Sequence, residues 1–453
     1  MNLIRDPWMP TDLGFLAPAS ALLSASSFNW GRGDWDAASQ VLLIGLLQTA
    51  LIRNPAICPD EEMWQELLDS PPSSDQIASW LKPLEPIFSG SAFEDFEELA
   101  DSKEVPIAFL FPECPKENTV KLCRDIAQWH ENVEKGLPEA EAKIALLADN
   151  MWGMGIGTGF KQGPRGGSRM TVFVEPNDAA ALIWHRVWLN ILSHERWLSI
   201  FKEAPWDESL IFPWTCKTQT KPVTMANAHP LTIYWTMPRR NRLVDAGESS
   251  ITHYRRSNGG PDYVGWRHPL SPYRATDSGP IALKIVPEHL GFNDWAGFAL
   301  INSGSTAPSV LVNEFLQYRM SDDMLRLRCV GWSSKNAEAI AWVQHTVPLI
   351  INADTEQVED LLEFAEMKRK RLYICITNVL ANSSSPSQAK FLAREAGNLL
   401  YSRTEALFYK LVRGKSDEGW SKKLKEVSVD LFYETTGKFN CDPMAVARQR
   451  LKL

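Results

Sequence analysis

The sequence predicts an α+β protein, with a mixed α/β N-terminal domain over residues 1–350 and a C-terminal four-helix bundle over residues 351–453. Three observations support this fold class. The chain has 453 residues, more than one ordinary domain, and 44% of them are hydrophobic, which is enough for a large core. Short β-like runs separated by turns fill residues 228–345. Apolar residues at helical spacing fill the tail.

The first part of the chain predicts one long helix between irregular segments. Residues 1–33 are expected to form short strands and turns. A helix capped by Asp34 or Asp36 then runs through residues 41–51 and stops at Asn54-Pro55. Prolines divide residues 61–100 into short helices.

Strands and helices then alternate. Residues 105–111 predict a buried strand, and residues 139–150 predict a helix with alanine and leucine on one face. A strand over 170–174 and a helix over 179–192 follow a glycine-rich stretch at 153–167, where a helix cannot persist. The main β-like runs beyond residue 228 are 231–237, 281–286, 298–302 and 324–332.

The tail predicts four amphipathic helices joined by short polar breakers. The apolar residues of its second helix recur at helical spacing, which is typical of a helical bundle. The expected helices cover residues 355–380, 387–412, 418–435 and 442–453.

Charge is distributed unevenly along the chain. The net charge is −8, which taken alone argues against a nucleic-acid binder. Residues 366–453, however, hold 17 Lys and Arg against 9 Asp and Glu, a net of +8, so residues 1–365 carry a net of −16. Such polarity is compatible with one face docking on a phosphate backbone.

Cysteine usage and hydropathy indicate a cytoplasmic protein. The seven cysteines are scattered and form no CxxC pair, which excludes a zinc ribbon and suggests reduced thiols. No signal peptide is visible at the start, and the longest apolar run, residues 41–47, is too short to span a membrane.

Common catalytic motifs are missing from the sequence. It contains no HExxH, no P-loop and no GxSxG, and its eight histidines are dispersed. A metal-dependent enzyme whose site assembles from distant residues remains an alternative.

The glycine-rich stretch is the strongest candidate for a binding site. Gly153, Gly155, Gly157 and Gly159 alternate, which removes Cβ atoms and allows the backbone to approach a ligand closely. Lys161, Arg165 and Arg169 follow and suit phosphate or a base edge, although a mobile surface loop explains the same pattern. Arginines and aromatics also interleave over 239–274, which fits nucleic acid or a salt-bridged core equally well.

Several segments resemble one known family, the CasA-type large subunit of Cascade, the type I-E CRISPR surveillance complex. GFKQGPRGGSRMTVFV at 159–174 is similar to that family's most specific signature. Further similar segments occur at 2–10, 234–243, 266–273, 330–337 and 398–408.

The resemblance implies a function as well as a fold. Members of the family combine a mixed α/β domain with a four-helix bundle and have no catalytic activity of their own. They sit at the 5′-handle end of the crRNA and recognise the protospacer-adjacent motif (PAM) in target double-stranded DNA. They help open the duplex and recruit a helicase-nuclease effector. The implied partners are therefore crRNA, target DNA, the other Cascade subunits and that effector, with no membrane.

The resemblance also assigns site residues to DNA and RNA. The family's PAM-contacting glycine loop matches Gly155, Ile156, Gly157, Thr158 and Gly159, with Lys161 close behind. Its wedge, a hairpin tip that enters the duplex, matches 332–336, where the candidates are Ser334, Lys335 and Asn336. A PAM-contacting lysine of the family falls at Arg255 or Arg256. The family's loop near the crRNA handle corresponds to 111–118, with Lys116 and Asn118 as candidate contacts.

No cofactor, metal or catalytic residue is expected. Some members carry a cysteine cluster in the central domain, but residues 237–251 here contain none, so zinc is not predicted. Two other functions stay open: a structural targeting subunit of a variant Cascade coupled to a fused nuclease or to transposition, and a cryptic metal-dependent nuclease.

Overall fold

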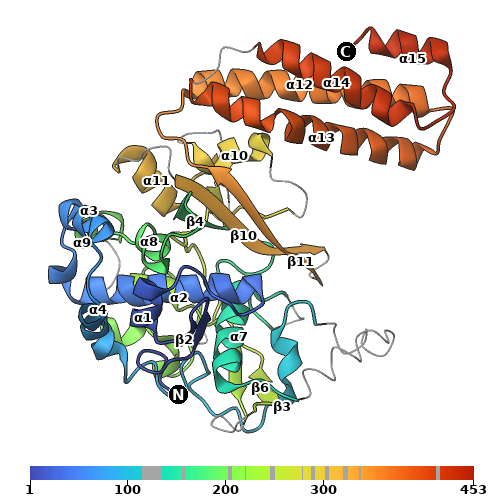
Figure 1. Cartoon of the computed structure of the whole chain (residues 1–453). Coiled ribbons are helices and arrows are strands. Elements are labelled where there is room, and N and C mark those ends of the chain that lie inside the picture. The colour runs from blue at the N-terminus through green and yellow to red at the C-terminus, as the bar shows by residue number, and fades with distance from the viewer. Residues whose placement is uncertain are drawn as a thin grey trace. The chain divides into compact units, whose positions relative to one another are not determined.

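The chain folds into two compact units of helices and sheets (Figure 1). Unit 1 comprises Met1–Pro287, Ser309–Glu314 and Met324–Thr346, and unit 2 comprises Glu288–Pro308, Phe315–Asp323 and Val347–Leu453. The computed structural model describes residues 1–114, 135–155, 159–201, 207–219, 221–244, 250–277, 279–286, 291–300, 306–319, 325–335, 338–414 and 419–453.

A long buried helix, α2 (Gly33–Arg53), lies at the centre of unit 1. Several other elements pack around it, and Gly45 lets Trp235 approach so closely that a Cβ atom would lie 2.8 Å from the indole ring. By length and composition α2 could cross a membrane, but 94% of its apolar window is buried inside the protein, as expected of a core helix. Among the described residues up to 201, the other α-helices of unit 1 are α1 (Pro18–Ser24), α3 (Glu61–Asp69), α4 (Ser74–Leu81), α7 (Glu139–Trp152), α8 (Ile183–Trp188) and α9 (His194–Phe201).

The N-terminus of α2 differs from the expectation, whereas its end agrees. Arg32 occupies the N-cap position, and Asp34 and Asp36 lie in the first turn, where acidic side chains interact favourably with the helix dipole. Asp34 also forms an ion pair with Arg32 at 2.9 Å. The helix ends at Asn54, just before Pro55.

Unit 1 contains small antiparallel sheets. One has the order β11-β10-β4, and β10 pairs with β4 from Leu325↔Pro176 to Val330↔Thr171. A second has the order β3-β6-β5, with β6 in the centre. The strands are β1 (Met9–Thr11), β2 (Gly14–Leu16), β3 (Lys103–Pro106), β4 (Thr171–Pro176), β5 (Arg240–Leu243), β6 (His253–Ser257), β7 (Tyr273–Arg274), β8 (Ile281–Ala282), β10 (Leu325–Lys335) and β11 (Glu338–Pro348).

Several predicted elements of the first domain are wrong in type or length. The strand expected over 105–111 ends at Pro106 and continues as a 3-10 turn, Ile107–Leu110. The β-like run at 231–237 is largely a 3-10 helix, Pro230–Tyr234, and the run at 298–302 begins inside a helix. Where they are described, these segments are mainly buried apolar runs, for which periodicity does not distinguish strand from helix.

Unit 2 is dominated by the predicted four helices. They are α12 (Thr355–Leu380), α13 (Pro386–Val412), α14 (Trp420–Thr436) and α15 (Pro443–Arg450). Their core includes Ile376, Leu400 and Phe408, all fully buried. Phe292 of α10 (Phe292–Ala299) stacks on Phe408 with ring centroids 4.4 Å apart. Two further elements outside the bundle are β9 (Thr306–Ala307) and α11 (Val310–Gln317). The α+β fold class with a C-terminal helical bundle is thus confirmed.

Candidate nucleic-acid interface

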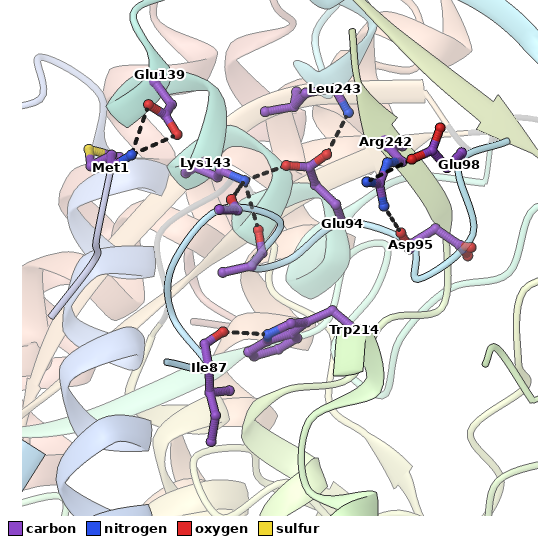
Figure 2. A network of polar contacts seen from close by, with 12 residues as sticks. Met1, Ile87, Glu94, Asp95, Glu98, Glu139, Lys143, Trp214, Arg242 and Leu243 are labelled. Atoms are coloured by element: carbon purple, nitrogen blue, oxygen red, sulfur yellow. Dashed lines mark hydrogen bonds and ion pairs between the residues drawn. The ribbon is translucent and has the colours of Figure 1, made fainter. Parts of the chain in front are cut away.

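A buried ion pair fixes the helix that leads into the glycine stretch (Figure 2). Lys143 of α7 is 1% exposed and donates to the carbonyl oxygens of Gly90 and Ala92 and to Glu94. The other carboxylate oxygen of Glu94 accepts from the backbone N–H of Leu243 at 3.0 Å, at the end of β5. Through the loop that carries Glu94, these contacts fix the positions of α7 and β5 relative to each other.

A second buried network lies where α7 ends and the glycine stretch begins. Arg239 donates to Asp149 at 2.7 Å and also to the carbonyl oxygen of Met154. Asn241 donates to the other oxygen of Asp149 at 3.0 Å. Burial raises the pKa of Asp149, while the charge of Arg239 and the amide of Asn241 counteract that rise. A Cβ atom on Gly153 would lie 2.6 Å from the Arg239 guanidinium, so only glycine fits at this exit from the helix.

Gly159 is fixed against the turn that follows β6. Its φ is +88°, and its carbonyl oxygen accepts from the backbone N–H of Gly259 at 3.1 Å. A Cβ atom at this position would lie 3.2 Å from the side chain of Asn258. Gly155 is half-buried, whereas Gly157 and Thr158 lie outside the described residues.

The two candidate arginines of β6 have different surroundings. The Arg256 guanidinium lies 5.5 Å from the ring centroid of Phe109 and 5.3 Å from that of Phe160, which directly follows Gly159. Arg256 therefore ties the glycine stretch to the β3-β6-β5 sheet. Arg255 has a side chain that is 34% exposed and approaches Glu104 only to 3.9 Å. Such a loose surface pair contributes little, so Arg255 is available to a phosphate.

Lys161 carries its charge at the surface but already has a partner. Its amino group lies 2.9 Å from a carboxylate oxygen of Asp262, and both side chains are more than 40% exposed. Because an exposed ion pair is weak, a phosphate group can replace the carboxylate at small cost. Arg165, in contrast, is 2% exposed, so the expectation that it flanks the glycine loop as a surface cation is wrong.

The hairpin formed by β10 and β11 reaches the same region. The hydroxyl of Ser334 hydrogen-bonds to that of Ser168, just after the glycine stretch, and a Cβ atom on Gly331 would lie 2.7 Å from the carbonyl oxygen of Arg169. Lys335, at the end of β10, is exposed, while Asn336 lies outside the described residues.

Packed indoles fix the base of this hairpin. Trp342 on β11 lies edge-on to Trp332 of β10, with ring centroids 5.8 Å apart, and edge-on to Trp152 of α7, at 5.1 Å. Because Trp332 is 5% exposed and Trp152 is fully buried, the hairpin is anchored in the core of unit 1.

The predicted site residues therefore belong to one connected region wherever they are described. The glycine stretch contacts the turn after β6 through Gly159 and β6 itself through Phe160, and Ser168, which directly follows the stretch, contacts the β10–β11 hairpin. Lys116 and Asn118 lie outside the described residues. In the part of the chain that the structure describes, no group of three or more His, Cys, Asp or Glu side chains could hold a metal ion.

Sequence reasoning missed the residues that support this region. Asp149 belongs to no motif, and the family-like segments that contain Asn241 and Ser168 assigned neither residue a role. The partners of the three residues are 90, 92 and 166 residues away in the chain. Only the mixture of arginines and aromatics over 239–274 indicated from the sequence that such supporting residues exist. Part of it is a salt-bridged core: Arg239 is buried against Asp149, and Arg240 pairs with Asp95 at 2.9 Å.

Comparison with known proteins identifies the family. The model of the family described as CRISPR-associated protein Cse1 matches residues 2–432. The chain belongs to the Cse1 family. No curated protein matches it by sequence.

Solved Cse1 structures share the fold over the whole chain. A Thermus thermophilus CasA (Cse1) structure is 16% identical, with a TM-score of 0.72, and the match covers 100% of this chain and 99% of that one. Thermobifida fusca Cse1 is 15% identical, with a TM-score of 0.70 and coverage of 100% and 97%. A chain of a CRISPR RNA-guided surveillance complex is 14% identical, with a TM-score of 0.73 and coverage of 100% and 98%.

Proposed function

We propose that this Cse1-family chain is the noncatalytic large subunit of a CRISPR RNA-guided surveillance complex and recognises the PAM in target double-stranded DNA. Family membership over residues 2–432 supports the proposal, as does the full-length likeness to a chain of such a complex. In this role the chain helps open the duplex for crRNA pairing and recruits a helicase-nuclease effector. Pairing with the guide reads the remaining sequence, so a few DNA contacts are sufficient.

The observation that carries the proposal is the connection between the glycine stretch and the hairpin. The Ser168–Ser334 hydrogen bond joins the two segments, and Arg256 holds Phe160 beside them. A backbone without side chains can enter a minor groove, whose pattern of donors and acceptors is degenerate. In this proposal the hairpin end that begins at the exposed Lys335 enters the next base step, and such an insertion commonly unstacks a duplex.

The charged residues at the surface complete the proposed interface. Arg255, Lys161 and Lys335 lie on or next to the connected segments and supply cations for phosphate contacts. On the family resemblance, Lys116 and Asn118 are proposed as contacts to the crRNA handle or a neighbouring subunit. Gly157, Thr158 and Asn336 are proposed as DNA contacts on the same basis.

Target binding by the reconstituted complex tests the function directly. The complex with its crRNA is assembled with and without this chain, and its binding is measured across a library of duplexes with randomised PAMs. We expect the chain to create PAM dependence, and we expect Gly157→Asp and Asn336→Ala to weaken or reshape it. Arg5→Ala serves as the control, because it removes a side chain near the N-terminus that is 68% exposed and is not a candidate site residue.

Two results would contradict the proposal. If binding with and without the chain shows the same PAM dependence, the chain does not recognise the motif. If the isolated chain cleaves DNA in the presence of a divalent metal, with activity that follows the protein through purification, the noncatalytic assignment is wrong.

A further inference from the structure

A second cluster of buried polar groups includes Arg165 of the glycine stretch. Arg165, Tyr234, His268 and Ser271 are between 0% and 2% exposed. Each has a side-chain polar atom without a hydrogen-bond partner in the described structure: Arg165 Nη1, Tyr234 OH, His268 Nε2 and Ser271 Oγ. Protein interiors pair nearly all such atoms, so four in one cluster point to a missing ligand.

Contacts and electrostatics place these groups together. The rings of Tyr234 and His268 meet edge to face with centroids 5.4 Å apart, and the backbone N–H of Ser271 donates to the carbonyl oxygen of His268 at 3.0 Å. Burial raises the pKa of Tyr234 and lowers that of His268, and the nearby charge of Arg165 lowers both. Arg165 itself lies over the ring of Trp152, 5.5 Å from its centroid.

The unpartnered atom of His268 is a hydrogen-bond donor. Its Nδ1 accepts from the backbone N–H of Leu270 at 3.1 Å, so the proton of the neutral ring is on Nε2. Burial lowers the pKa of His268 well below its ordinary value, which keeps the ring neutral at pH 7. The guanidinium can only donate, and the two hydroxyls can also donate. All four unpartnered atoms are therefore able to donate a hydrogen bond to an acceptor.

The charge of Arg165 indicates what kind of acceptor is missing. Burial lowers the pKa of Arg165, which shows that the surroundings oppose its charge, but an arginine keeps its proton in proteins. Among the described residues no carboxylate forms an ion pair with it, whereas the equally buried Arg239 pairs with Asp149 at 2.7 Å. A water molecule would satisfy the hydrogen bonds but leave a buried positive charge uncompensated.

We propose that Arg165, Tyr234, His268 and Ser271 bind a small monovalent anion, with chloride as the physiological ligand. One negative charge balances the single guanidinium. Enclosure by Trp152 and Tyr273, which are 0% and 7% exposed, favours a compact ion over sulfate or phosphate. The anion lies under the segment that follows Gly159, so it stabilises the base of the glycine stretch. This inference does not depend on the proposed DNA-targeting function.

Anomalous diffraction tests the site without any mutation. Crystals of the full chain grown in bromide should give an anomalous peak within hydrogen-bond distance of Arg165 Nη1 and His268 Nε2. A water-like peak with no anomalous signal would overturn the proposal, and so would a carboxylate of the chain occupying that position.

Chloride-dependent stability provides an independent test. At constant ionic strength, replacing gluconate with chloride should raise the Tm of the wild-type chain. Arg165→Met should abolish that rise, and Tyr234→Phe should weaken the apparent chloride affinity about fivefold through loss of one hydrogen bond. Arg274→Met removes an exposed charge next to Tyr273 and should keep the full effect.

Arg165→Met and Tyr234→Phe together make the chloride-dependent stability test decisive. Should Arg165→Met fail to fold, Tyr234→Phe still changes a single buried hydroxyl and reports on the same ion. Equal chloride effects in Tyr234→Phe, Arg274→Met and the wild type would overturn the proposal, as would a wild-type Tm that does not respond to chloride.

Discussion

Single residues in the interface divide into those that hold the backbone and those that face the ligand. Gly153 has no room for a Cβ atom, Gly159 has a φ of +88°, and the Arg256 guanidinium contacts two aromatic rings. Arg255 and Lys335 have exposed or half-exposed side chains without strong partners. Substitutions of the first kind should change stability and binding together, and those of the second kind should change binding alone.

Gly159 is the sharpest test of the backbone role. Gly159→Ala should lower the free energy of unfolding by about 1 kcal/mol, because a non-glycine residue is strained at φ +88°, and it should also reduce PAM-dependent binding. Gly14→Ala is the matched control, because Gly14 has φ +99° with nothing within 4 Å of its Cβ position. If both variants lose the same stability and the same binding, the position of Gly159 has no special role.

The two adjacent arginines of β6 should behave differently. Arg256→Met should cost about 1–2 kcal/mol of stability, since two cation–π contacts are lost. Arg255→Met should leave stability within about 0.5 kcal/mol of wild type but reduce the salt dependence of DNA binding by about one charge in the log–log slope. Urea unfolding and binding titrations at several salt concentrations measure both effects. A stability loss in Arg255→Met together with a reduced salt slope in Arg256→Met would contradict this prediction and exchange the roles of the two arginines.

The buried Lys143–Glu94 pair should be essential to unit 1. Lys143→Met leaves the Glu94 carboxylate buried without its partner, so we expect a loss of about 3–5 kcal/mol. Adding Glu94→Gln should restore part of that loss by removing the isolated charge. Lys82→Met, at an exposed lysine, should have little effect in the same urea unfolding series. A loss below about 1 kcal/mol for Lys143→Met would show that water reaches the pair.

At the scale of elements, the helices α12 and α13 are joined by a polar contact that depends on pH. Glu366 accepts from Arg369 at 2.6 and 2.8 Å and from the hydroxyl of Tyr401 at 2.6 Å. These hydrogen bonds, chiefly from Arg369, lower its pKa from 4.5 to about 2. A carboxylate with a lowered pKa stabilises the folded state above its unfolded value and loses that contribution as the pH falls.

Acid unfolding should therefore reveal this contact. The stability contributed by Glu366 is complete above pH 4.5 and disappears as the pH falls to about 2. Glu366→Gln should flatten that part of the pH–stability profile, measured by thermal unfolding, whereas Glu395→Gln, at an exposed position, should not. Identical profiles for the two variants would show that the Glu366 contacts do not persist in solution.

At the scale of the whole molecule, the sequence predicted what local patterns determine. The boundaries of the four tail helices were predicted to within three residues, because apolar spacing and polar breakers such as NSSSPS are local signals. The segment Pro230–Tyr234 was assigned the wrong structure, because a buried run next to Trp235 has no periodicity.

The sequence predicted the segments of the candidate site that are proposed to contact DNA, but not the buried residues that support them. Alternating glycines and a family signature located the glycine stretch and the hairpin. The buried Asp149–Arg239 pair and the Ser168–Ser334 bond depend on the tertiary fold, since their partners are 90 and 166 residues apart. The burial of Arg165 was likewise not predictable, because an arginine in a glycine-rich stretch resembles a surface cation until its neighbours in space are known.

The central claim is that the hairpin beside the glycine stretch acts on the duplex next to the PAM. Site-specific photocrosslinking from benzoylphenylalanine at Lys335, in the complete complex with crRNA and target DNA, tests it most directly. We predict crosslinks to the first base pairs beside the PAM, which disappear on a duplex without the motif. Crosslinks spread evenly along the duplex, or confined to the crRNA, would contradict the account.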